Sequence, residues 1–170
     1  SKRFFLEDAE QVLALDAHVV YTAPLNLKYE TGLTGKLQSD VVLPMIKLQD
    51  REGNACAAGR QAMRKMLLKR ADRSLFASDA EIDTLVDYSG GHPRELLRLL
   101  SYACDSAESN RIDAATVEQA IQLLAADYRR FLEPDDYPVL AEIDVDPMHG
   151  GNDQRIRRLL FGTALLEYND

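Results

Sequence analysis

Cysteine is scarce in this chain of 170 residues, and so are the residue spacings that bind metals. The two cysteines, Cys56 and Cys104, lie far apart in sequence of helical character, which excludes a disulfide framework. We expect both to be small buried residues of a reducing compartment. The three histidines, His18, His92 and His149, are scattered and share no ligand spacing with either cysteine, so no metal site is expected.

Long apolar runs are also missing. No stretch approaches the roughly 18 consecutive apolar residues of a membrane-spanning helix, and no secretory signal opens the chain, so we expect a cytoplasmic protein without a membrane partner. With 46% hydrophobic and 28% charged residues, the composition is that of a globular domain. The chain opens with Ser1 in sequence that is already helical, which suggests a fragment of a longer protein.

The net charge of −8 is unevenly distributed. Residues 28–73 carry ten Lys/Arg against five Asp/Glu, giving +5, whereas residues 1–27 give −2 and residues 74–170 give −11. Such a basic middle faces either its own acidic neighbours or an anionic ligand. The acidic balance of the whole chain argues against general nucleic-acid binding, but not against one small basic site.

The N-terminal third alternates between helical and strand-like patterns. Apolar residues at helical spacing predict a helix over 4–15, and the run HVVYTAPL predicts a buried strand over 18–25 that Pro24 ends. After a polar loop, DVVLPMIKL predicts a second strand over 40–48, at a sheet edge because Pro44 donates no hydrogen bond. Two strands are too few for a free-standing α/β domain, so they are interpreted as part of a larger parallel sheet.

The remaining sequence has helical apolar spacing. Asp79, Asp113 and either Asn152 or Asp153 are the expected capping residues, and Pro93 opens a further helix. The predicted helices cover residues 57–70, 80–89, 93–105, 114–132, 135–143 and 154–161, and a terminal strand is expected over 163–168. The expected core side chains are Met63, Met66, Leu67, Leu96, Leu97, Leu100, Val117, Ala120, Ile121, Leu124 and Tyr128.

These patterns predict a mostly α fold in three parts. A two-strand remnant of a parallel α/β sheet occupies residues 1–55. A helical bundle follows over 56–132, and a partial winged-helix-like segment follows over 133–170. No internal repeat and no low-complexity run interrupts this order.

The stretch SGGHPRELLRLL, residues 89–100, places two glycines, a histidine, a proline and an arginine before a leucine-rich helix. Helix initiation explains most of it, because the glycines give a left-handed exit from one helix and Pro93 fixes the start of the next. On this structural interpretation Arg94 and Arg98 are solvated one turn apart. A functional interpretation uses the same geometry, because a helix N-terminus with an arginine in its first turn suits a phosphate group.

This order of elements resembles the second half of an AAA+ ATPase, most closely that of the signal-transduction (STAND) and origin-recognition branches. The resemblance extends along the whole chain, and its specific part is the glycine-proline-arginine stretch. It implies that Arg94 is the sensor-2 arginine and that Thr22 occupies the sensor-1 position. Gly91 and Pro93 would form the Gly-x-Pro motif that contacts the nucleotide. His92 lies beside them as a cap-position residue that touches the base or a water.

The resemblance implies a nucleotide-dependent molecular switch, in which this chain supplies the lid and the sensor residues that read ATP against ADP. The parent protein would bind ATP or ADP with Mg²⁺ through the upstream nucleotide-binding part of the same protein, with a second copy or another protein as a further partner. This chain alone is expected to bind no cofactor and to hold no catalytic residue, because it lacks a phosphate loop and a strand ending in paired acids. Residues 4–50 also lack an arginine finger, which favours a switch over a ring-forming motor.

Two alternatives stay open. One is a nucleotide-independent helical protein-interaction module, in which the sheet fragment pairs with another chain or a second copy. The basic helix face within residues 60–73 is a separate candidate that would dock acidic neighbours or a partner, although a solvated face explains the same residues better. The other, which the acidic charge disfavours, is a winged-helix DNA-binding protein in which Arg155, Arg157 and Arg158 face phosphates.

Overall fold

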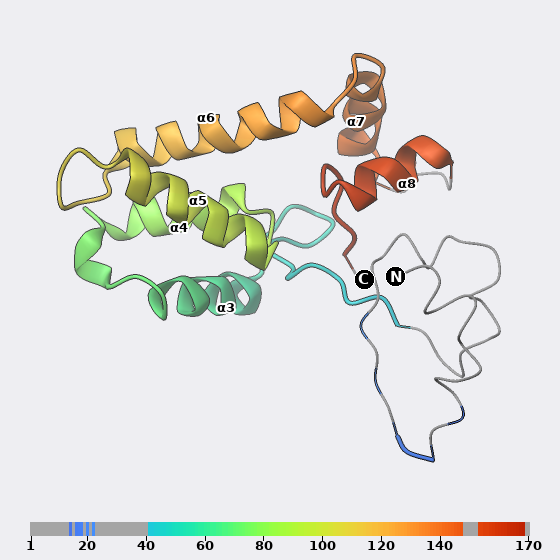
Figure 1. The fold of residues 1–170 in the computed structure, drawn as a ribbon, viewed down its shortest axis with the longest axis horizontal. Helices are drawn as coiled ribbons and strands as arrows, with labels where there is room; N and C mark the ends of the chain where they lie inside the picture. Colours follow the sequence, from blue (N-terminus) through green and yellow to red (C-terminus); the bar gives the residue numbers. More distant parts are fainter. Residues whose placement is uncertain are drawn as a thin grey trace. The chain divides into compact units, whose positions relative to one another are not determined.

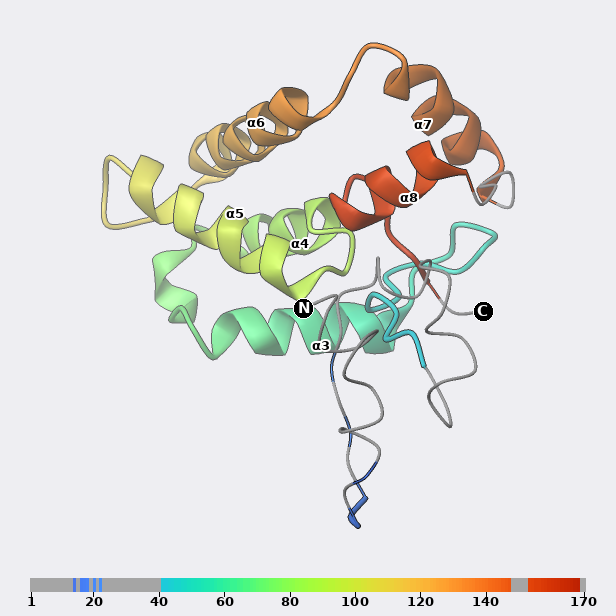
Figure 2. The same cartoon turned by 45° about the vertical axis from the view of Figure 1, so that its right-hand side comes forward.

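The computed structural model describes residues 41–147 and 153–168 and, in isolation, residues 14, 16–18, 20 and 22. This part of the chain forms six α-helices and a short 3₁₀ helix and contains no strand (Figures 1 and 2), so the mostly helical class predicted from the sequence is confirmed. None of the described helices has the length and the apolar composition that crossing a bilayer requires. The predicted helix over 4–15 and strand over 18–25 lie outside the described residues, apart from the isolated ones.

The chain divides into two compact units. Unit 1 consists of Ser1–Leu43 and Gly150–Leu165, and unit 2 consists of Pro44–His149 and Leu166–Asp170. Unit 2 contains, in chain order, α3 (Ala57–Leu68), η2 (Arg73–Leu75), α4 (Asp79–Tyr88), α5 (Pro93–Ser106), α6 (Ala114–Phe131) and α7 (Asp136–Val145). The described part of unit 1 contains α8 (Gln154–Phe161). The predicted domain boundaries after residues 55 and 132 stay predictions.

Polar side chains set the starts of α4, α5, α6 and α8 by accepting hydrogen bonds from the first free N–H groups, and the cap of α5 is described with the candidate site. At α4 the cap is Ser78, which forms a capping box with Glu81, so the predicted cap Asp79 is wrong by one residue. The Asp113 carboxylate caps α6 as predicted. In unit 1 the cap of α8 is Asp153, one of the two residues expected there.

The core of unit 2 is formed by the apolar stripes of α3 to α6. Of the described helix pairs, α5 and α6 make the most extensive contact, and both views show them side by side (Figures 1 and 2). The stripes predicted for α3 and α6 are confirmed, whereas α5 buries Leu99 and Ala103 and leaves Leu97 half-buried. The most completely buried side chains include Met63, Leu67, Phe76, Ile82, Leu85, Leu96 and Leu99.

The predicted second strand, residues 40–48, is not confirmed by its described part. Residues 41–48 are irregular. The backbone N–H groups of Met45 and Ile46 bond to two different segments of unit 2 and not to one neighbouring strand. A strand needs a continuous ladder to one partner, and these two bonds do not make one.

The terminal strand predicted over 163–168 is not confirmed either. After α8 ends at its C-cap, Gly162, the backbone of Thr163 has a positive φ of 59°, which turns the chain out of an extended course. The residues that follow, as far as Tyr168, are irregular. The partial winged-helix-like segment over 133–170 is therefore not confirmed, and its two described helices, α7 and α8, belong to different units.

The cysteines are less buried than predicted. Cys56 is half-buried just before α3, and Cys104 is exposed on α5; both are free thiols. Because α5 turns Leu99 and Ala103 into the core, Cys104 lies off the buried stripe, and the prediction that it is buried is wrong. Its remaining burial, followed by the nearby charge of Asp105, raises the pKa of the Cys104 thiol.

Candidate functional site at the start of α5

The turn that joins α4 to α5 has a left-handed backbone. Gly90 and Gly91 have φ values of 57° and 72°, which residues with a Cβ adopt only at a cost. The Gly91 carbonyl oxygen accepts a hydrogen bond from Ile46 N–H at 3.1 Å. A Cβ on Gly91 would lie 1.8 Å from the Ile46 carbonyl oxygen, so the close approach that requires glycine here is to Ile46.

His92 is the N-cap of α5, as the sequence predicted. Its Nδ1 accepts a hydrogen bond from Arg94 N–H at 3.1 Å, which requires a ring without a proton on Nδ1. Partial burial lowers the pKa of His92; the Glu95 carboxylate opposes this shift and the charge of Arg94 adds to it. The neutral ring therefore closes the helix end, and contact of His92 with a base or a water stays a prediction.

Arg94 is the exposed arginine of α5. Pro93 occupies the first helical position, where its fixed φ suits the helix, and Arg94 follows in the same turn with an exposed side chain. The Arg94 guanidinium makes no ion pair within the described part of the chain. Its N–H donors are thus presented to solvent at the positive end of a helix of 14 residues.

One turn further along, Arg98 is held by its neighbours, so the expectation that it is solvated is wrong. Its guanidinium bonds to Glu95 on α5 at 2.8 Å and to Asp127 on α6 at 2.7 Å. The Tyr102 hydroxyl donates to the same Asp127 carboxylate at 2.5 Å, and the guanidinium carbon of Arg98 lies 5.9 Å from the centre of the Tyr102 ring. This polar network joins α5 to α6.

Sequence reasoning missed all three partners of Arg98. The spacings of Glu95 at i−3 and Tyr102 at i+4 are a signal that was available, because residues at these spacings share one helix face. Glu95 is only 5% exposed, and this burial of a charged residue cannot be seen from the sequence of α5 alone. Asp127 has no such signal, because its approach to Arg98 depends on how α5 packs on α6.

Most backbone N–H groups at this helix start already have acceptors. Gly91 N–H bonds to the Ser89 hydroxyl at 3.3 Å, and His92 N–H bonds to the Ser89 carbonyl at 2.9 Å. Arg94 N–H bonds to the His92 ring, and Pro93 has no N–H. An anion at this position would therefore be bound mainly by the Arg94 side chain and less by the backbone.

Thr22, the implied sensor-1 residue, belongs to unit 1. It is exposed and has no regular secondary structure. Gly91, His92, Pro93 and Arg94 are consecutive in unit 2, where the turn and the first turn of α5 hold them together. The approach of Thr22 to these four residues stays a prediction.

Three of the six basic residues over 60–73 pair with acidic neighbours inside unit 2. Four ion pairs connect the arginines of α3 and η2 to α4: Arg60–Asp87 at 2.5 Å, Arg64–Asp79 at 3.1 Å, Arg64–Asp83 and Arg73–Asp79. For these three arginines, the predicted docking on acidic neighbours within the chain is therefore the explanation that applies.

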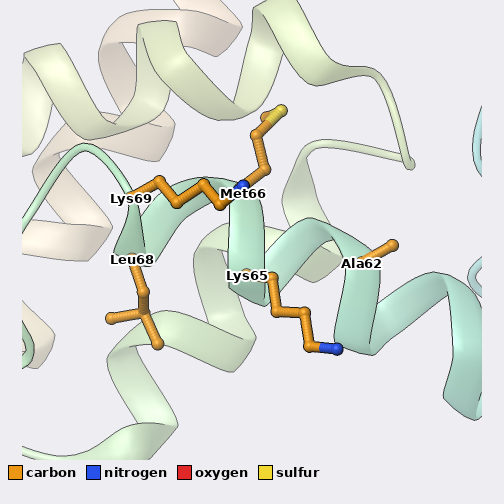
Figure 3. Close-up of a pocket in the computed structure, with 5 residues that line it drawn as sticks. All are labelled: Ala62, Lys65, Met66, Leu68 and Lys69. Carbon is orange, nitrogen blue, oxygen red and sulfur yellow. The ribbon is translucent and has the colours of Figure 1, made fainter.

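The opposite face of α3 carries charges without such partners. Lys65 and Lys69 are exposed and make no ion pair with described residues. Together with Ala62, Met66 and Leu68 they border an open hollow of about 460 Å³, and Figure 3 shows the five side chains along this helix. Residues 62, 65, 66 and 69 have the i, i+3, i+4, i+7 spacing of a single helix face.

In unit 1, α8 buries Ile156 and Leu159. Its three arginines, Arg155, Arg157 and Arg158, are half-buried, and each has an interaction partner. A recognition helix presents such side chains to the DNA, and these are engaged elsewhere. Their contact with DNA phosphates stays a prediction.

The start of α5 is therefore a helix end with one exposed guanidinium, a neutral histidine cap and a backbone that is largely satisfied. Among the described residues, no group of three or more His, Cys, Asp or Glu side chains could hold a metal ion. No family model, curated protein or solved structure matches this chain.

Proposed function

We propose that this chain supplies the lid and the sensor of a nucleotide-dependent molecular switch of the AAA+/STAND kind, with Arg94 bound to the terminal phosphate of ATP. The observation that carries the proposal is the contrast between the two arginines near the start of α5. Arg98 is bound to Glu95 and Asp127, whereas Arg94 is exposed without an ion pair among the described residues. An unpaired arginine at the positive end of a helix is suited to an anion that another part of the protein brings.

The neighbours of Arg94 have supporting roles in this proposal. Pro93 and the neutral ring of His92 fix the first turn of α5, so the Arg94 side chain extends from a rigid point. Gly91 permits the close approach of the turn to Ile46. Thr22 would act at the sensor-1 position, on the nucleotide-binding part. We assign no catalytic residue to this chain.

ATP or ADP would be held with Mg²⁺ by the upstream part of the same protein, of which the predicted strand over 18–25 and the irregular segment over 41–48 form the end. The lid would pass the nucleotide state to a winged-helix-like module that begins after α6. ATP and ADP differ at the γ-phosphate, and a ligand shifts a conformational equilibrium only through contacts that differ between its states. In this proposal, Arg94 contacts the γ-phosphate of ATP and has no such contact with ADP, and this difference shifts the equilibrium.

Nucleotide affinity of the protein encoded by the complete reading frame tests this proposal. A hydrogen bond to a charged group contributes about 1.5–3 kcal/mol, so Arg94→Ala should weaken ATP binding by roughly 10- to 100-fold and leave ADP binding unchanged. Arg129→Ala removes another exposed arginine, at the end of α6, and is the matched control. Equal affinities of wild type and Arg94→Ala for ATP would refute the sensor role. Absence of thermal stabilisation of the wild type by either nucleotide would refute the switch.

The hollow on α3 favours a second function, a nucleotide-independent helical interaction module. Lys65 and Lys69 share a helix face with Ala62 and Met66, so this face suits an acidic amphipathic helix of a protein partner. The probe is a synthetic helix with leucines on one face and flanking glutamates. Binding that is lost in Lys65→Glu/Lys69→Glu, in a protein that no nucleotide stabilises, supports this function; failure of the wild type to bind the probe excludes it.

A further inference from the structure

Three segments of unit 2 meet at the turn before α5. The first is Met45 and Ile46, before α3, and the second is the turn at Gly90 and Gly91. The third is residues 166–168, which follow α8 in sequence. Ile46 N–H donates to the Gly91 carbonyl at 3.1 Å, and Met45 N–H donates to the Glu167 carbonyl at 2.9 Å. Two successive residues of the first segment thus bind the turn and residues 166–168, and lie between them.

Residues 166–168, here named the strap, also contact the turn directly. The Tyr168 hydroxyl donates a hydrogen bond to the Gly90 carbonyl oxygen. The Leu166 side chain lies so near that a Cβ on Gly90 would be 2.6 Å from its Cδ1 atom. Burial raises the pKa of Tyr168, so its hydroxyl keeps the proton that it donates at neutral pH. The strap therefore holds the turn through a side-chain bond, an apolar contact and the shared neighbour Met45.

The strap continues directly from the chain segment that carries α8. Gly150–Leu165 belongs to unit 1, and the next residue, Leu166, belongs to unit 2. The chain thus returns to the helical bundle at the turn that precedes His92 and Arg94. The strap therefore contacts the bundle next to the exposed Arg94.

We infer that the strap is a conformational coupling device between the start of α5 and the segment that carries α8. Displacement of the glycine turn would loosen Tyr168 and Met45, and release of the strap would loosen the turn. Coupling between two sites is reciprocal, so each end must respond to a change at the other. That the strap also transmits the nucleotide state rests on the proposed function, whereas the mechanical coupling stands without it.

Hydrogen exchange of the protein encoded by the complete reading frame tests the coupling from the strap. Tyr168→Phe removes the hydroxyl and keeps the ring, so exchange at the Met45 and Ile46 amides should accelerate about fivefold, as expected for the loss of one net hydrogen bond. Tyr88→Phe removes an exposed hydroxyl on α4 and is the matched control. Unchanged exchange at Met45 and Ile46 in Tyr168→Phe, with α5 and α6 still protected, would overturn the inference.

The reverse direction is tested from the turn. Gly91→Ala displaces Ile46 and should accelerate exchange in the strap, and the milder Gly90→Ala serves if Gly91→Ala does not fold. A strap that keeps its wild-type protection in both folded variants would also overturn the inference.

The link to the nucleotide has its own readout. Strap protection should differ between the ATP and ADP states and should cease to differ in Arg94→Ala. A strap that responds to Tyr168→Phe but not to nucleotide supports the mechanical coupling and overturns its role in the switch. If nucleotide binds and the strap does not change, the role of the strap in the switch fails while the proposed function stands.

Discussion

At the scale of single residues, the turn before α5 uses three neighbours for three different properties. Position 91 requires glycine because the Ile46 carbonyl occupies the space that a Cβ would fill. His92 is needed for a ring nitrogen that accepts a hydrogen bond. Arg94 extends its side chain into solvent and contributes its backbone N–H to the cap. Substitutions here should therefore separate effects on folding, at Gly91 and His92, from effects on binding, at Arg94.

Gly91 and Gly90 should differ sharply in their tolerance of alanine. Gly91→Ala forces a Cβ onto the backbone of Ile46 at a positive φ, and we expect it to lower the free energy of unfolding by about 3 kcal/mol. A Cβ in Gly90→Ala meets the flexible end of Leu166 and, at ordinary contact distance, the Tyr168 hydroxyl, so the cost should be about 1 kcal/mol, mainly for the backbone conformation. Urea denaturation measures both. Equal losses for the two variants would contradict the close approach to Ile46.

His92 should make the stability of unit 2 depend on pH. The folded state lowers the His92 pKa below its ordinary value of 6.5, so the unfolded chain takes up a proton first as the pH falls. The stabilisation is complete above pH 6.5 and is lost as the pH falls through the lower pKa of the folded state. His92→Asn retains a capping acceptor that does not titrate, whereas His92→Ala loses about 1 kcal/mol of cap at neutral pH.

Urea unfolding of the wild type and His92→Asn at about pH 7.5 and about pH 5 measures this effect, because His18 and His149 are common to both proteins. We expect the free energy of unfolding to fall less in His92→Asn. The same loss in both proteins would show that the ring does not cap the helix in its neutral form.

At the scale of elements, charged side chains join helices whose apolar faces already form the core. The arginines of α3 reach the acids of α4, and Arg98 of α5 reaches Asp127 of α6. Such pairs add little stability when they are exposed, and they select one alignment of the two helices when they are well placed. The alignment of α5 on α6 also fixes the direction from which Arg94 extends, since both arginines belong to the same helix.

Asp127 allows the two kinds of pair to be compared at a single carboxylate. Arg98 binds it at 2.7 Å with 36% of its side chain exposed, whereas Arg130 binds it at 3.3 Å with 81% exposed. In double-mutant cycles of Asp127→Asn with Arg98→Gln and with Arg130→Gln, we expect coupling energies of about 1 kcal/mol and about zero. Equal coupling energies would mean that the link between α5 and α6 contributes no more than a surface pair.

The helices were largely predictable from sequence because their signals are local. Pro93, Asp113 and Gly162 act on the residues beside them, and the apolar stripes repeat within one helix. At the start of α4 the sequence predicts Asp79 as the cap and the structure has Ser78. Both residue types are good caps, and the capping box with Glu81 favours Ser78. The predicted strand over 40–48 failed for a different reason, since a strand depends on a partner that local patterns do not identify.

At the scale of the whole molecule, the candidate site was only partly predictable. The local sequence identified the turn, the histidine cap and the exposed Arg94. It did not reveal that Gly91 faces Ile46, that Asp127 holds Arg98 or that Tyr168 reaches Gly90, because these partners are distant in sequence. The arrangement around the site therefore depends on tertiary packing, whereas the identity of its central residues does not.

Acid should destabilise the helical bundle in a narrow range of pH. Hydrogen bonds hold the pKa values of several carboxyls below their ordinary values; Glu81, Asp113 and Asp127 accept such bonds from Ser78, Thr116 and Tyr102. Lowered pKa values stabilise the fold above the unfolded-state values and lose this effect as the pH falls through the folded-state ones. From neutral pH down to the isoelectric point of about 4.9, the loss of net negative charge acts in the opposite direction.

We therefore expect the melting temperature to change little from neutral pH to about pH 5 and to fall steeply below about pH 4. Thermal unfolding followed by circular dichroism across this range measures it. A melting temperature that stays constant below about pH 4 would show that the capping carboxylates contribute no net stability.

The bond between Met45 and Glu167 has a consequence for how the bundle can be handled. Unit 2 begins at Pro44 and its last described residue is Tyr168, so its first and last segments are hydrogen-bonded neighbours. A domain whose ends are adjacent tolerates circular permutation and insertion into a surface loop of another protein. Gly150–Leu165 of unit 1 lies between the two segments of unit 2 in sequence, so a permuted bundle that is closed here by a short linker and opened elsewhere would carry that segment as an insertion.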